Sequence, residues 1–256
     1  MILNKKNVVI TGAASGIGLG LAKRFAKESP NSLHLFDISP SIFSIAAQCN
    51  AKGYMVDVTN EEQVSVAIKK IVEENGSIDI YCSNAGYQKL GTLDIPNDQW
   101  EKMWQVNVMS HVYAARNLFD DMVKNKCGYF LITVSAAGLL NMNGSLGYAT
   151  TKHAAVGLAE NFSIMYDSKG IKISILCPQL VDTEMLRLAD NISKHHPLFK
   201  DGILTAEEVA ECALKGIEDE SFLILPHQQV KKYIQFKSAD YEKWLKSFRQ
   251  LVENEK

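Results

Sequence analysis

The stretch Thr-Gly-Ala-Ala-Ser-Gly-Ile-Gly spans residues 11–18 and closes an apolar run, Asn7–Thr11, that has the pattern of a buried strand. A helical pattern of apolar residues starts directly after it. Glycines between a strand and a helix permit a tight turn and a close approach of the backbone to a pyrophosphate. The free N–H groups and the dipole of the helix N-terminus favour the anion. The sequence therefore predicts a dinucleotide-binding turn made of Gly12, Ser15, Gly16, Ile17 and Gly18.

A second strand-like segment, Leu33–Asp37, ends in an acid at the expected distance of about 20 residues after the glycine turn. A carboxylate there accepts hydrogen bonds from both hydroxyls of an adenosine ribose and repels a 2′-phosphate. No Arg or Lys stands beside it to offset that repulsion. The alternative is a glycine turn that arose by chance, but the strand-turn-helix context and Asp37 favour a site for NAD(H) over NADP(H).

Short apolar runs alternate with stretches of helical spacing along the whole chain, which is typical of parallel strands covered by helices on both faces. The predicted strands are Asn7–Thr11, Leu33–Asp37, Gly53–Val56, Ile78–Ser83, Tyr129–Val134, Ile171–Leu176 and Phe222–Leu225. The predicted helices cover residues 16–29, 40–49, 60–75, 97–125, 147–168 and 205–219. We expect an α/β fold with a doubly wound, seven-stranded parallel sheet. No linker or repeat divides the chain, so residues 1–256 are expected to form a single domain.

Composition excludes several classes of protein. The 256 residues carry 27 basic and 29 acidic side chains, a net charge of −2 that predicts neither nucleic acid nor a membrane as partner. No apolar run is long enough to cross a bilayer, and no signal-peptide core follows Met1, so a cytoplasmic protein is expected. The five cysteines and six histidines show no spacing typical of a metal site or a disulfide framework. We expect no metal.

Tyr148 and Lys152 are one helical turn apart in the predicted helix 147–168. A phenol has an ordinary pKa of about 10, and a neighbouring lysine stabilises its phenolate. Lowering that pKa by about three units takes roughly 4 kcal/mol, more than one exposed ion pair supplies. We therefore expect a positively charged nicotinamide ring to complete the site.

Together, Thr11–Gly18, Asn84-Ala85-Gly86, Asn107, Ser135 and Tyr148–Lys152 resemble the short-chain dehydrogenase/reductase family over nearly the whole chain. The resemblance implies a Rossmann fold and an oligomer, a homodimer or a homotetramer. It also implies that Tyr148 is the general acid/base, that Ser135 orients the substrate oxygen and that Lys152 holds the nicotinamide ribose. Asn107 would bind a water that links Lys152 to solvent. Each residue also has an ordinary structural interpretation, but four coincidences at family spacing are improbable.

The resemblance implies further cofactor contacts by Asp57 and Val58 at the adenine, by Asn84, Ala85 and Gly86 at the adenosine, and by Pro178 and Thr183 near the nicotinamide. Asp57 could equally cap the following helix. Two positions depart from the family pattern. Ser83 stands where Asn is more frequent, and Gln179 replaces the glycine that usually follows Pro178. Because glycine reaches conformations that Gln cannot reach cheaply, the loop is expected to take a different path.

The later part of the chain should choose the substrate. In this family residues 182–205 form a substrate lid, which here contains Met185, Leu186, Leu188, Ile192, Leu198, Phe199 and Ile203. With Leu139, Leu140, Met142 and Leu146 they predict a medium-sized, fairly apolar alcohol or ketone, unless they pack only against the protein. Arg187, His195 and His196 could meet an anionic group.

The tail, residues 227–256, carries a net charge of +3, and an apolar stripe at helical spacing begins near Ser238. We expect a helical extension docked on its own subunit or on a neighbour, with a membrane-surface helix as the alternative.

The expected activity is NAD(H)-dependent interconversion of a secondary alcohol and a ketone, with oxidation favoured. The alternatives are a 3-ketoacyl thioester reductase, which Asp37 disfavours, and a non-catalytic dinucleotide-binding regulator, which has no need for the four catalytic residues.

Overall fold

A single seven-stranded sheet forms the centre of the computed structural model, which describes residues 1–187 and 200–253. The strand order is β3-β2-β1-β4-β5-β6-β7, and every neighbouring pair is parallel. The strands are β1 (Asn7–Thr11), β2 (Ser32–Asp37), β3 (Lys52–Met55), β4 (Ile80–Ser83), β5 (Gly128–Thr133), β6 (Ile171–Leu176) and β7 (Leu223–Ile224). The predicted doubly wound Rossmann sheet in a single domain is therefore confirmed.

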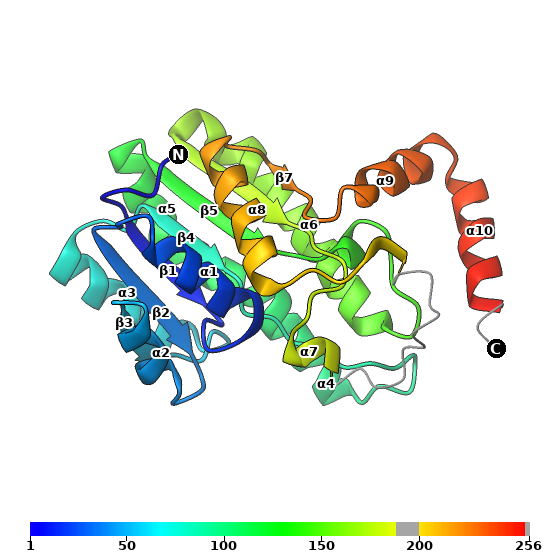
Figure 1. Cartoon of the computed structure of the whole chain (residues 1–256), viewed down its shortest axis with the longest axis horizontal. Helices are drawn as coiled ribbons and strands as arrows, with labels where there is room; N and C mark the ends of the chain where they lie inside the picture. The colour runs from blue at the N-terminus through cyan, green and yellow to red at the C-terminus, as the bar shows by residue number, and fades with distance from the viewer. Residues whose placement is uncertain (188–199, 254–256) are drawn as a thin grey trace.

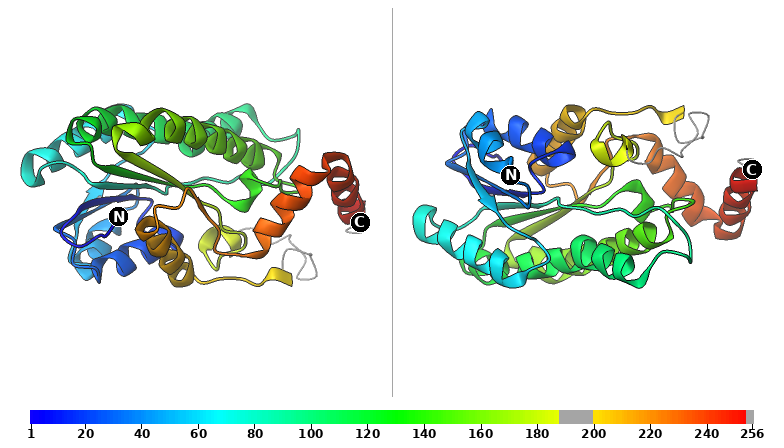
Figure 2. Two further views of the ribbon diagram at one scale, coloured as in Figure 1. Left: turned by 90° about the horizontal axis from the view of Figure 1, so that it is seen from above. Right: turned by 90° about the horizontal axis from the view of Figure 1, so that it is seen from below.

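Helices cover both faces of this sheet (Figure 1). They are α1 (Gly16–Ala26), α2 (Ile42–Gln48), α3 (Glu61–Asn75), α4 (Asn97–Trp104), α5 (Ser110–Asn125), α6 (Leu146–Tyr166), α7 (Glu184–Arg187), α8 (Ala206–Glu218), α9 (Gln229–Ala239) and α10 (Tyr241–Glu253). Helices α1, α2 and α8 lie on one face, and α3, α5 and α6 lie on the other (Figure 2). Helices α9 and α10 stand beyond the end of the sheet, and α10 packs mainly on α9.

The core is divided by the sheet into two apolar layers. Val8 and Ile10 of β1 pack with α1 and α8, whereas Val9 between them packs with α3 and α5. Successive strand residues point to opposite faces, so a strand buried on both faces needs apolar residues at every position. This requirement explains the continuous apolar runs in the sequence.

Two helix starts follow the local sequence signals. The Asn60 side chain caps α3 by accepting a hydrogen bond from the Gln63 N–H, at 3.0 Å. Thr205 and Glu208 form a capping box at the start of α8, in which each side chain accepts from the other residue's backbone N–H. Such caps satisfy N–H groups that a helix leaves unpaired at its first turn.

Two predicted helices differ in the structure. The span 97–125 is not one regular helix, because residues Gln105–Met109 form a π-helical turn between α4 and α5. The tail is not one helix from Ser238 but the pair α9 and α10. The break falls at Asp240, whose backbone is extended and whose carboxylate caps α10 by accepting from the Lys243 N–H, at 2.9 Å. Helix α9 lacked a clear periodic signal, since only Val230 in it is fully buried.

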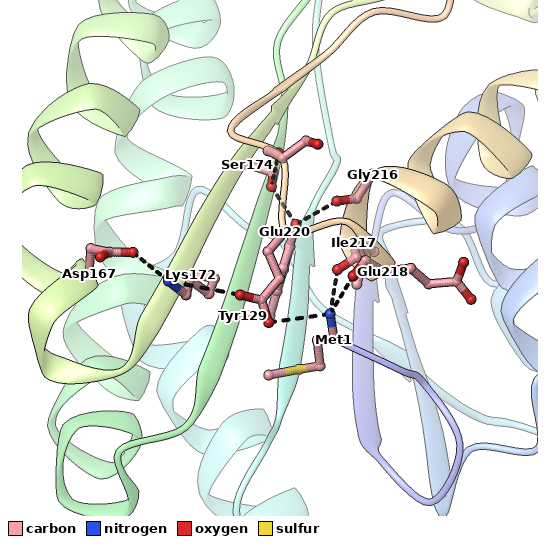
Figure 3. Close-up of polar contacts among 10 residues, drawn as sticks. Met1, Tyr129, Asp167, Lys172, Ser174, Gly216, Ile217, Glu218 and Glu220 are labelled. Carbon is pink, nitrogen blue, oxygen red and sulfur yellow. Dashed lines mark hydrogen bonds and ion pairs between the residues drawn. The ribbon is translucent and has the colours of Figure 1, made fainter.

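A polar cluster ties the chain's N-terminus to the turn between α8 and β7 (Figure 3). The Met1 amino group donates to the Ile217 carbonyl at 2.6 Å and lies 3.4 Å from Glu220, which also pairs with Lys172. The buried Tyr129 hydroxyl hydrogen-bonds Ser174 nearby. Tyr129 lies near the start of β5, so this network fastens the amino-terminal side of the sheet.

At the opposite, carboxyl-terminal edge, the chain leaves β1 toward one neighbour, β2, and later returns to the other side of β1 as β4. Ligands of such folds bind in the crevice outside the strand ends at this switch point. No helix in the described part of the chain is long and apolar enough to cross a membrane.

Candidate active site

A cleft of about 530 Å³ opens at the switch point. It brings together residues from the ends of β1, β2, β4, β5 and β6 and from α6 and α7. All of the predicted catalytic and cofactor-binding residues line it except Gly18 and Asn107. Within residues 1–187 and 200–253, no three His, Cys, Asp or Glu side chains gather as ligands for a metal ion.

The glycine turn forms the floor of one end of the cleft. Gly12 has a φ of +64°, and a side chain there would place its Cβ 2.8 Å from the Ala85 Cα atom. Ser15 precedes α1 without capping it through its side chain, and the first turn of α1 contains no acid. The start of α1 is therefore open to an anion, as an intact pyrophosphate cradle requires.

Gly18 lies where α1 packs against the glycine turn. A Cβ on Gly18 would lie 2.0 Å from the Gly12 carbonyl oxygen, so only glycine lets α1 pack this closely on the turn. The residue does not line the cleft.

Asp37 and Asp57 stand at the ends of neighbouring strands and line the end of the cleft where the sequence predicts the adenosine. The Asp37 carboxylate accepts from the Ala14 and Ser39 N–H groups, both at 2.9 Å, which fixes it beside the glycine turn. Asp57 does not cap α3, since Asn60 does, and its carboxylate accepts from the Thr59 N–H and hydroxyl. Among the residues that the structure describes, Lys102 and Lys152 are the only lysines that line the cleft, and no arginine does.

Asn84 joins the ends of three strands. Its Nδ2 donates to the Thr11 carbonyl at 3.0 Å, and its Oδ1 accepts from the Thr133 hydroxyl at 2.9 Å. In return the Thr11 hydroxyl accepts from the Asn84 and Ala85 N–H groups at 2.9 and 3.0 Å. The sequence motif alone assigns no role to Thr11, because a threonine at a strand end can make many different contacts.

Ser135, Tyr148 and Lys152 meet at the other end of the cleft. The Tyr148 hydroxyl lies beside that of Ser135, and the Lys152 ammonium lies 5.6 Å from the centre of the Tyr148 ring. Lys152 is almost completely buried and donates to the Thr133 carbonyl at 3.0 Å. The spacing of one helical turn on α6 therefore places both side chains at the end of β5.

Burial dominates the electrostatics of this pair. It raises the pKa of Tyr148 to about 12, although the Ser135 hydrogen bond works in the opposite direction. It lowers the pKa of Lys152 to about 8. Desolvation disfavours the charged form of each group. The chain by itself therefore does not stabilise a tyrosinate, in keeping with the expectation that a further positive charge completes the site.

Asn107 lies in the π-helical turn and is fully buried beneath the cleft. Its Oδ1 accepts from the Tyr87 N–H at 2.9 Å, and its Nδ2 donates to the Tyr87 carbonyl and to the Thr151 hydroxyl, at 2.8 and 3.0 Å. Both amide hydrogens are thus used to connect the loop after β4 with α6. Its expected water contact stays a prediction.

Ser83, which stands where the family more often has Asn, is hydrogen-bonded to a second buried residue, His111. The Ser83 hydroxyl hydrogen-bonds Nδ1 of the buried His111 at 2.6 Å. Burial, with the positive charge of Lys152 nearby, lowers the pKa of His111 to about 3, so the ring is neutral. Sequence reasoning missed His111 because its partner lies on a strand 28 residues earlier.

Gln179 replaces the glycine that the family usually has at this position. The substitution causes no backbone strain here, because Gln179 does not adopt the left-handed backbone that favours glycine. The Pro178 carbonyl accepts from the Ala136 N–H at 2.8 Å and from the Ser135 hydroxyl at 3.5 Å. Thr183 lines the cleft over the glycine turn, and its methyl group would lie 3.2 Å from a Cβ on Gly16.

The substrate side is partly as predicted. Met142, Met185 and Leu186 line the cleft, while Leu139, Leu140, Leu146 and Ile203 do not. Arg187 pairs with Asp182 at 2.9 Å and does not line the cleft. Leu188, Ile192, His195, His196, Leu198 and Phe199 lie outside the described residues.

Comparison with known proteins gives this arrangement a family. The family model for short chain dehydrogenases matches residues 6–192. Oxidoreductase UcpA of Escherichia coli is 33% identical over 211 residues, 79% of each chain. The mitochondrial borneol dehydrogenase of Lavandula x intermedia is 31% identical over 229 residues, 88% of each chain. A short chain dehydrogenase/reductase from Burkholderia phymatum, solved in complex with NAD, superposes with a TM-score of 0.84 at 25% identity, covering 94% of this chain and 96% of that one.

A Rossmann sheet with a dinucleotide cleft defines the class, and the chain belongs to the short-chain dehydrogenase/reductase family of oxidoreductases.

The Thr11 junction can be tested by removing one hydroxyl. Thr11→Val leaves the Asn84 and Ala85 N–H groups without their acceptor, so we expect the free energy of unfolding to fall by about 2 kcal/mol. Thr11→Ser keeps the hydroxyl and should lose clearly less. Urea denaturation measures both. A Thr11→Val variant as stable as the wild type, beside a destabilised Thr11→Ser, would show that the methyl group, and not the hydrogen bonds, matters at this position.

Proposed function

We propose that the protein is an NAD(H)-dependent oxidoreductase that interconverts a secondary alcohol and a ketone. The observation that carries this proposal is the grouping of Ser135, Tyr148 and Lys152 at one end of the cleft, with Asp37 and the glycine turn at the other end. A nicotinamide bound there would supply the hydride acceptor or donor. The NAD-bound relative supports the same choice of cofactor.

The chain's own residues then divide the work. The Ser135 hydroxyl donates only a long hydrogen bond of 3.5 Å, to the Pro178 carbonyl, so it can turn to donate to the substrate oxygen and hold it beside the Tyr148 hydroxyl. Tyr148 takes the alcohol proton during oxidation and returns it during reduction, which is general acid/base catalysis. Lys152, kept close by its hydrogen bond to the Thr133 carbonyl, stabilises the tyrosinate that forms. Asn107 holds the loop after β4 against α6, and so fixes the floor beneath Lys152.

The apolar residues Met142, Met185 and Leu186 at the substrate side support a medium-sized, fairly apolar substrate. That the related borneol dehydrogenase is named for a compact apolar secondary alcohol is consistent with this choice. We also propose that residues 182–205 form the substrate lid, of which α7 is the described part at the cleft.

We further propose that the protein is a homodimer or homotetramer. On α6, Ile164 and Met165 are 81% and 53% exposed, an uncommon position for two large apolar side chains on neighbouring residues. A partner packed on this face would cover them and brace the helix that carries Tyr148 and Lys152.

Cofactor preference is the first test. We expect NADH to bind at least tenfold more tightly than NADPH, because the Asp37 carboxylate repels a 2′-phosphate. Asp37→Asn removes that charge and should reduce the difference to less than threefold. Fluorescence titration measures both affinities. Glu184→Gln, which removes an acid elsewhere in the cleft, should leave the preference unchanged, and tighter binding of NADPH by the wild type would favour the ketoacyl thioester reductase.

The role of Tyr148 is tested by turnover. Tyr148→Phe should reduce kcat at least a thousandfold, because the proton acceptor is lost, while the Kd for NADH changes less than threefold. The assay follows NADH formation with a panel of apolar secondary alcohols headed by borneol. Tyr113→Phe, whose hydroxyl bonds Gln105, serves as the control and should retain activity. Undiminished turnover in Tyr148→Phe removes the residue from its role, and silence across the panel in a wild type that binds NADH favours the regulator.

Assembly is tested separately by light scattering. The wild type should have two or four times the mass of one chain, and Ile164→Lys should shift it toward the monomer because a charge cannot be buried unpaired in an apolar contact. Ile2→Lys, at an exposed apolar residue elsewhere, should leave the mass unchanged. A monomeric wild type would contradict the oligomer proposal.

A further inference from the structure

His227 lies between β7 and α9, at the start of the C-terminal extension, residues 227–256. Its ring is buried, and its Nδ1 accepts a hydrogen bond from the Gln179 N–H at 3.1 Å. Gln179 is the residue that replaces the family's glycine in the loop after β6. The first residue of the extension therefore contacts the one loop of the cleft that departs from the family pattern.

The peptide group between Pro178 and Gln179 is held from both sides. On one side its N–H binds His227, and on the other its carbonyl accepts from the Ala136 N–H and from the Ser135 hydroxyl. An amide plane is rigid, so fixing the N–H also fixes the direction of the carbonyl. The position of His227 is thus transmitted through one peptide group to Ser135.

Helix α9 holds the segment after Ser135 by two further contacts. Val230 is fully buried and packs against Ala136 and Leu140. The Lys237 ammonium donates to the Leu139 carbonyl at 2.7 Å. In Figure 1, a short loop leads from β7 to α9 beyond the end of the sheet. The extension therefore supports both loops at this end of the cleft, the one after β5 and the one after β6.

The hydrogen bond requires an imidazole without a proton on Nδ1. The negative charges of Asp201 and Glu208 favour the protonated imidazole. The nearby backbone carbonyls of Gly202 and Leu180 favour it as well. Burial acts against them and prevails, so the pKa of His227 lies below its ordinary value. At neutral pH the ring is neutral and can accept. As the pH falls through that pKa, Nδ1 becomes a donor and the hydrogen bond is lost.

We propose that His227 is a positioning residue of the active site, through which the C-terminal extension fixes the Pro178–Gln179 peptide and with it Ser135. The hydrogen bond itself does not depend on turnover, whereas its catalytic consequence rests on the proposed function.

The test compares two substitutions by amide hydrogen exchange in the full-length protein with saturating NADH. Asn places its side-chain oxygen near the position of Nδ1, so His227→Asn should keep exchange in residues 176–181 and 134–140 within threefold of the wild type. His227→Leu cannot accept and should speed exchange in both segments at least tenfold. Lys232→Met, an exposed change on α9, is the matched control. Equal exchange in the Asn and Leu variants would overturn the proposal.

A pH series keeps the test decisive even where His227→Leu fails to fold. After correction for intrinsic exchange rates, protection of residues 176–181 in the wild type should fall as the pH is lowered from 7 through the pKa of His227, which NMR titration of the ring locates, and His227→Asn should show no such fall. A flat wild-type profile, or the same fall in both proteins, would contradict the role of His227. Exchange that depends on His227 in a protein without turnover on any alcohol would instead retain the contact and discard the proposed function.

Discussion

The hydrogen bonds between Thr11 and Asn84 are the constraint on which the site depends. Parallel strands that separate at a switch point leave their last N–H and C=O groups without a partner strand, and unpaired buried polar groups are costly. Here the Asn84 amide satisfies the Thr11 carbonyl at the end of β1, and the Thr11 hydroxyl satisfies the Asn84 N–H after β4. The Thr133 hydroxyl ties the end of β5 to the same amide. The crevice is therefore a stable opening in the sheet edge, and the glycine turn on one side keeps a fixed position relative to Ser135 on the other.

Around this junction, the site combines the free backbone N–H groups at the start of α1 with the buried ammonium group of Lys152. The open start of α1 suits an anion, whereas Lys152 is desolvated so strongly that its pKa falls to about 8. A lysine in such surroundings keeps its proton best when negative charge or strong acceptors lie close by. The Thr133 carbonyl is one such acceptor, and a tyrosinate would be another. Burial of the pair thus couples the charge of Lys152 to that of Tyr148 more tightly than an exposed pair could be coupled.

The fold could be predicted from the sequence because each strand and helix signal lies within a few neighbouring residues. Strands buried on both faces leave continuous apolar runs, and Asn60 and Thr205 mark their helices by side chains that reach only three residues ahead. The glycine turn, Tyr148 and Lys152 are likewise short-range patterns. By contrast, the contacts of Ser83 with His111 and of Gln179 with His227 join residues 28 and 48 positions apart, and no period or motif announces them. The division of the tail at Asp240 was missed because its apolar stripe was read without the cap that interrupts it.

The π-helical turn at Gln105–Met109 has a consequence for how this chain can vary. A turn of this kind holds about one residue more than an α-helical turn, so it shifts the angular phase of α4 relative to α5 by about 100°. That phase is what brings Met103 against Gly147 at the start of α6, where an added Cβ would lie only 2.4 Å from the Met103 methyl group. Deleting a single residue here would restore a regular α-helix, but it would also rotate Met103 away from its contact with Gly147. The segment therefore tolerates exchange of side chains more readily than any change in length.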